Sequence, residues 1–107
     1  MISTERMEMA LKYLAETDEQ FAELKTLVER CKLQMKSVYA TIYLRVDGTV
    51  DERKSKAETH ESHQEAMQAY FTALKEYEHV RNKRGTEMVL IDVWRSLNSS
   101  RNKGQIV

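Results

Sequence analysis

The histidines are the residues of this chain best suited to chemistry. His60 and His63 stand three positions apart, with Glu58 and Glu61 beside them. On a helix this spacing places two imidazoles on one face, where they can share a metal ion. A tetrahedral site needs more ligands than this stretch offers, and Cys31 is distant in the sequence. A solvated polar face is therefore the better interpretation, and we expect no metal.

Other catalytic patterns are equally weak. His79 lies among residues typical of a helix surface, and no serine, cysteine or histidine group has the spacing of a nucleophile with its base. The sequence contains no glycine-rich phosphate loop. An enzyme would need a site assembled across subunits from the histidine pair and nearby carboxylates. We therefore predict a protein that is not an enzyme and that holds no cofactor.

The C-terminal segment, residues 93–107, is the one place where a binding function competes with a structural one. Beyond Asp92 the chain has basic residues and no acidic ones. Cations neutralise phosphates, and a tryptophan face or an asparagine amide can engage bases, so single-stranded or duplex DNA is a candidate ligand. The opposing interpretation is structural, because Trp94 has core-like spacing from Ile91 and Leu97, and the helix dipole favours basic residues at a C-terminus. The candidate nucleic-acid contacts are Trp94, Arg95, Asn98, Arg101 and Lys103.

Helices must position these candidates, because the chain has no proline and only three glycines. A heptad seam, with apolar residues at alternating steps of three and four, begins at Leu14 and ends at Ile42. The same spacing is typical of any core-facing helix, so the seam predicts packing rather than a ligand groove. The residues expected to hold the core or an oligomer interface are Leu14, Phe21, Leu24, Val28, Met35, Val38 and Ile42.

A second apolar stripe runs beside this seam and contains Tyr39, Tyr43 and Val46. Two long helices form a thin core, and a second apolar face is best buried by another chain. We therefore expect a dimer or a higher homo-oligomer, with the stripe or the basic C-terminal segment as the surface for a further protein partner.

The pattern predicts an all-α fold, a long antiparallel helical hairpin resembling a coiled coil, within a single domain of residues 1–107. One helix is expected over residues 4–46, and Asp47 with Gly48 supplies the turn at 47–49. Thr49 and Glu52 form a capping box that begins a second helix over 50–98. The polar first part of this helix, residues 51–65, is expected to be a solvated overhang or to order on a partner. Residues 99–107 are expected to be a flexible basic tail.

The hairpin also predicts a register. Reflection about Gly48 places Arg81 and Arg84 near positions 15 and 12. The polar interval 81–84 is therefore predicted to lock the register against the acidic turn around Thr17 rather than to form an exposed binding patch.

Composition narrows the remaining possibilities. The 17 basic and 17 acidic residues balance, so no overall field attracts nucleic acid or an anionic membrane. Cys31 is the only cysteine and lies on the seam, which indicates a buried thiol in a reducing compartment or, as the alternative, an intersubunit disulfide. No apolar stretch reaches the length of a membrane span, and the charged N-terminus is unlike a signal peptide. We expect a cytoplasmic protein with no membrane partner.

Two segments, Tyr13-Leu14-Ala15-Glu16-Thr17-Asp18 and Val93-Trp94-Arg95-Ser96-Leu97-Asn98, resemble small coil-containing proteins of tailed bacteriophages. The likeness spans most of the chain. That family has no settled activity, so the resemblance implies only an accessory protein made in the bacterial cytoplasm, near replication or recombination. The leading hypothesis is a non-enzymatic, oligomeric helical adaptor; the alternative is a nucleic-acid-binding accessory factor that uses the basic C-terminal segment.

Overall fold

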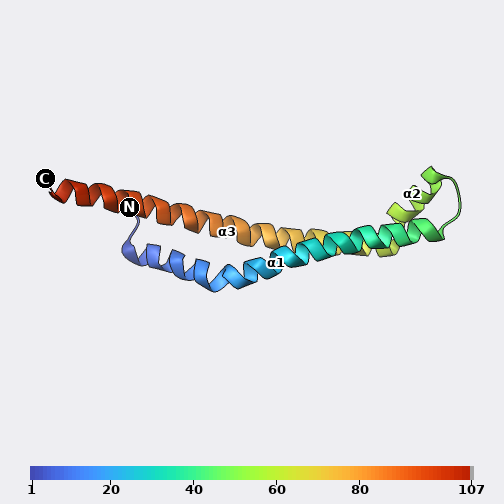
Figure 1. Cartoon of the computed structure of the whole chain (residues 1–107), viewed down its shortest axis with the longest axis horizontal. Coiled ribbons are helices and arrows are strands. Elements are labelled where there is room, and N and C mark those ends of the chain that lie inside the picture. Colours follow the sequence, from blue (N-terminus) through green and yellow to red (C-terminus); the bar gives the residue numbers. More distant parts are fainter. Residues whose placement is uncertain (107) are drawn as a thin grey trace. The chain divides into compact units, whose positions relative to one another are not determined.

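Three helices account for the regular structure of the chain (Figure 1). The computed structural model describes the backbone of residues 1–106 and the side chains of residues 1–101. Helix α1 spans Thr4–Arg45, α2 spans Val50–Thr59 and α3 spans Glu61–Ile106. No strand occurs within residues 1–106. The predicted all-α class is confirmed.

The contacts of the chain divide it into two compact units. The terminal unit combines Met1–Phe21 with His79–Val107, and the loop unit is Ala22–Glu78. In the terminal unit the two segments pack antiparallel, since Arg6 contacts Glu87 whereas Thr17 contacts Arg84. Two long helices bury too little for one shared core, and no large side chain is fully buried among the described residues.

Local signals at both ends of α1 match the prediction. The backbone N–H of Arg6 donates to Ser3 Oγ at 3.0 Å, which caps the first turn. Helix α1 ends at Arg45, and Gly48 then adopts a φ of +128°, a conformation that side chains with a Cβ rarely adopt. The backbone N–H of Glu52 donates to Thr49 Oγ1 at 3.2 Å, which is the predicted threonine half of the capping box.

The predicted helix over 50–98 is interrupted in the structure. The residue after α2, His60, has extended backbone with ψ of 138°. The Nδ1 atom of His60 accepts from the backbone N–H of Ser62, and the Gln64 amide donates to the carbonyl of Glu58. Side chains therefore satisfy the backbone groups that the interruption exposes. Neither proline nor glycine marks this position, which is why the sequence pattern missed it.

The polar stretch is largely helical, and α2 contacts the end of α1. Arg53 donates to the carbonyl of Tyr43 at 3.0 and 2.9 Å, and Lys56 donates to the carbonyl of Asp47 at 2.8 Å. Ala57 is completely buried. Helix α2 thus folds back on the end of α1, where Arg53 binds a carbonyl of the last turn of α1 and Lys56 binds a carbonyl of the following connection.

Helix α3 continues well past the predicted end at 98 and reaches Ile106. The Arg101 guanidinium donates to the sulfur of Met1 at 3.0 Å. Residues 99–106 are therefore helical rather than a tail. The predicted mobility of the side chains of residues 102–107 lies outside the described residues.

Candidate functional site

The predicted seam faces the inside of each unit. In the terminal unit Leu14 and Phe21 are half-buried. In the loop unit Leu24, Val28 and Ile42 are buried, and Met35 and Val38 are half-buried. The chain's own helices therefore cover Leu24, Val28 and Ile42 and partly cover the other four seam residues.

The aromatic stripe is also partly covered by its own chain. The Arg53 guanidinium lies 4.3 Å from the ring centroid of Tyr43, and the His63 ring meets the edge of Tyr39 with centroids 5.4 Å apart. Both tyrosines are half-buried. Helix α2 and the start of α3 therefore lie against the stripe for which a second chain was expected.

We expect the substitution Arg53→Ala to loosen α2 locally. It removes both hydrogen bonds to the Tyr43 carbonyl and the cation–π contact with the same residue. Amide hydrogen exchange in residues 50–59 should accelerate by roughly tenfold, the equivalent of about 1.4 kcal/mol. The exposed neighbour Lys54 offers the matched control, and Lys54→Ala should leave exchange unchanged. Equal exchange in the two variants would contradict this role of Arg53.

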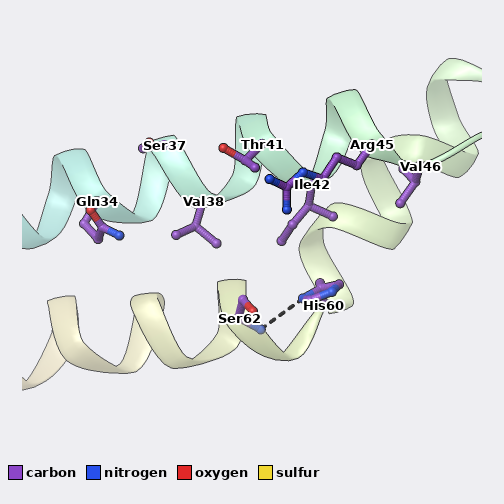
Figure 2. Close-up of a pocket in the computed structure, with 9 residues that line it drawn as sticks. All are labelled: Gln34, Ser37, Val38, Thr41, Ile42, Arg45, Val46, His60 and Ser62. Carbon is purple, nitrogen blue, oxygen red and sulfur yellow. Dashed lines mark hydrogen bonds between the residues drawn. The ribbon is translucent and has the colours of Figure 1, made fainter.

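A groove of about 350 Å³ lies in the loop unit (Figure 2). Val38, Ile42 and Val46 supply its apolar residues, and His60 with Ser62 lies across from α1. The remaining lining residues are Gln34, Ser37, Thr41 and Arg45. His60 Nδ1 already accepts a hydrogen bond from Ser62, and no nucleophile–base pair lines the groove. The groove can accommodate an apolar group but has no evident chemistry.

The histidine pair has no metal-binding geometry. His63 lies against Tyr39, and its Nδ1 is buried without a hydrogen-bond partner, while His60 is exposed and bonded to Ser62. Across the described part of the chain, no group of three or more histidine, cysteine, aspartate or glutamate side chains is placed to hold a metal ion. No helix in this part is both long and apolar enough to cross a bilayer.

The candidate nucleic-acid residues differ in how far their own chain covers them. Trp94 is half-buried because its side chain packs against the core cluster of Met7, Ala10 and Ile91. Asn98 is half-buried, and Arg101 donates to Met1. Arg95 is exposed, lies about 100° around the helix from Trp94, and pairs weakly with Asp92 at 3.7 Å. The side chain of Lys103 lies outside the described residues.

The terminal unit contains a network of polar side chains that sequence reasoning predicted in part. The Arg84 guanidinium donates to the carbonyl of Leu14 at 2.9 Å, to Thr17 Oγ1 at 2.7 Å and to an Asp18 carboxylate oxygen at 3.2 Å. It also lies 5.1 Å from the ring centroid of Phe21. The predicted lock of the 81–84 interval against the turn around Thr17 is therefore present, with Arg84 at its centre.

A second ion pair was not predicted. Arg6 donates to both carboxylate oxygens of Glu87, at 2.8 and 2.7 Å. Glu87 is the buried charged residue of this unit, and the hydrogen bonds from Arg6 lower its pKa. The same hydrogen bonds raise the pKa of Arg6. The Arg84 and Arg6 contacts both join α1 to α3 and fix the register of the helix pair.

The largest unexplained feature is an uncharged surface on α3, which we call the outer α3 face. At about 100° per residue its members lie on the side of α3 roughly opposite buried Glu87 and Ile91. No acidic or basic residue interrupts it over five turns. It consists of Asn82, Gly85, Thr86, Val89, Val93, Ser96, Leu97 and Ser100.

This face is apolar and open at its centre. Val89 is 62% exposed, Val93 43% and Leu97 44%, so a large part of each side chain faces solvent. A shallow, open groove of about 690 Å³ lies beside Gly85 and is lined by residues of α3 alone, between Arg81 and Val89. A Cβ added at Gly85 would have nothing within 4 Å. The face therefore has the composition and the shape of a helix-packing surface with no helix on it.

The sequence contains a four-residue repeat on this face, which lies outside the heptad seam of residues 14–42. The sequence pattern groups Met88, Ile91, Trp94 and Leu97 on one side of the helix, but only Ile91 is buried and Trp94 half-buried; Met88 is 54% exposed. A repeat of four residues places Gly85, Val89, Val93 and Leu97 in one ridge, which could have been recognised.

Comparisons with protein-family models, with curated proteins and with solved structures gave no match to the chain.

Proposed function

We propose that this protein is a non-enzymatic helical adaptor that acts through protein–protein contacts, and that the outer α3 face makes them. The observation that carries the proposal is the ridge of exposed valine and leucine side chains beside an open notch at Gly85. An uncharged, apolar surface of this kind favours another protein, because nucleic acid would require cations there.

The alternative function, nucleic-acid binding through the C-terminal segment, has less support. It depended on Trp94 as a stacking platform, and the indole packs on Met7, Ala10 and Ile91 instead. Arg95 and Arg101 remain as cations, but they do not share a surface with an available aromatic ring.

Site-specific photo-crosslinking tests the proposal. A photoreactive phenylalanine analogue at Val93 lies on the outer α3 face, and the same analogue at Arg95 lies on the charged side of the same helix turn. In cells that produce the full chain, we expect protein adducts from position 93 and few or none from position 95. Equal crosslinking at both positions, or none at 93, would contradict the proposal. Salt-sensitive binding of a short oligonucleotide that Arg95→Ala and Arg101→Ala weaken would favour the alternative.

A further inference from the structure

Gly85 is the residue whose presence its own chain does not explain. It lies inside α3, where glycine is less favourable than alanine. It does not need a left-handed backbone, since Gly48 is the glycine with positive φ among the described residues. It does not relieve crowding either, because an added Cβ would meet nothing within 4 Å. A glycine in such a position makes room for something outside the chain.

Val89 has the complementary shape one turn further along the same face. Its side chain is 62% exposed and borders the groove beside Gly85. If two copies of α3 pack antiparallel about a two-fold axis between these positions, Val89 of each copy enters the notch at Gly85 of the other. A two-fold interface requires this self-complementarity, in which one patch supplies both knob and hole.

The charges beside the face favour the same arrangement. Arg81 and Asp92 are eleven residues apart, so they lie about 20° from each other around the helix, along the same edge of the outer α3 face. A two-fold axis midway between Gly85 and Val89 brings Arg81 of one copy close to Asp92 of the other. In a parallel pair the same edge of the two copies would lie on opposite sides of the contact, so Arg81 would not meet Asp92. The formal net charge of zero leaves no overall repulsion between copies.

We propose that a second copy of this chain occupies the outer α3 face, packed antiparallel with Val89 of each copy in the Gly85 notch of the other and Arg81 opposite Asp92. This inference rests on the proposed function, because it names the partner of the same surface. Figure 1 shows α3, on which the entire contact lies.

The main test is the solution mass of the full chain and of Gly85→Leu, measured by light scattering and sedimentation equilibrium. The wild type should be a dimer whose mass does not depend on salt, and Gly85→Leu should weaken the dimer by tenfold or more. The substitution fills open space within its own chain, so the far-UV CD spectrum and the melting temperature of the dilute protein should not fall. Arg95→Leu, which adds the same side chain outside the face, should leave the dimer intact.

Two further measurements test the antiparallel orientation of the two copies. Arg81→Glu and Asp92→Lys should each weaken the dimer, and the double variant should restore it. Arg81 also has a partner within its own chain, so restoration in the double variant is the informative result. In a Cys31→Ser background, spin labels at position 100 should be about 39 Å apart in the antiparallel pair and about 10 Å apart in a parallel one.

The outcomes separate this inference from the proposed function. A wild-type monomer at about 100 µM, or a dimer unaffected by Gly85→Leu, would overturn the antiparallel pair. If position 93 then crosslinked to a different protein, the adaptor proposal would stand with another partner. A monomer with no adduct at position 93 would refute both.

Discussion

Replacing Arg84 with alanine is expected to lower the free energy of unfolding by about 2–4 kcal/mol. Only 13% of the Arg84 side chain is exposed, and it bonds the Leu14 carbonyl, Thr17 and Asp18. The substitution leaves these acceptors without their donor and removes the cation above the Phe21 ring. The Asp18 part of the network adds little, because that carboxylate is 79% exposed.

Urea denaturation followed by CD measures this effect. The neighbouring Lys83 supplies the matched control, since it is exposed and its ammonium lies 4.5 Å from the ring centroid of Tyr13. Lys83→Ala should cost about 0.5 kcal/mol. Arg84→Lys keeps the charge but loses the planar fork of donors, so it should show most of the loss. Stability of Arg84→Ala within about 0.5 kcal/mol of wild type would show that the network does not hold the helix pair.

The same network shows how far sequence reasoning determines the register. The prediction placed Arg84 near position 12, whereas it bonds residues 14–18, about one helical turn further along α1. The reflection assumed one uninterrupted helix after Gly48. Helix α2 and the extended His60 use residues between α1 and α3 that the reflection did not count. Arg84 therefore pairs with later residues of α1 than the reflection predicted. Charge complementarity identified the partner correctly, but the position of the interruption could not be read from the pattern.

Periodicity determines which face of a helix turns inward, and it was informative for α1. Val28 and Ile42 on the seam are buried, whereas Leu33 between them is 66% exposed. Contacts between residues far apart in sequence could not be predicted from periodicity. The Arg6–Glu87 pair joins positions 81 residues apart, and no spacing within either helix marks it.

The outer α3 face was missed for a related reason. Its residues are ordinary in a helix, and their meaning depends on which side of α3 the chain itself covers. Once Ile91 is known to be buried and Val89 exposed, the ridge stands out as a surface without a partner. Local pattern therefore gave the elements, while the candidate site needed the tertiary arrangement of the terminal unit.

Acidification is expected to destabilise the protein through Glu87. The hydrogen bonds from Arg6 are the largest cause that lowers the pKa of Glu87 below its ordinary value of 4.5, and burial opposes them. The folded state then holds the proton less tightly than the unfolded state. The stability from this carboxylate is therefore fully present above the unfolded pKa and is lost as the pH falls through the folded pKa. The urea midpoint should fall as the pH is lowered below about 4.5.

Glu87→Gln isolates this contribution. At neutral pH it should cost about 1–2 kcal/mol, a figure reduced for solvent screening because the Arg6 side chain is 41% exposed. The difference between variant and wild type should shrink as the pH falls, since protonated Glu87 and glutamine are nearly equivalent partners for Arg6. Glu16→Gln serves as the control, because Glu16 is 63% exposed and its ion pair with Lys12 is long, at 3.8 Å. Its pH profile should follow the wild type. A constant difference between Glu87→Gln and wild type from pH 7 to pH 3 would mean that burial of Glu87, rather than its charged pairing with Arg6, decides its contribution.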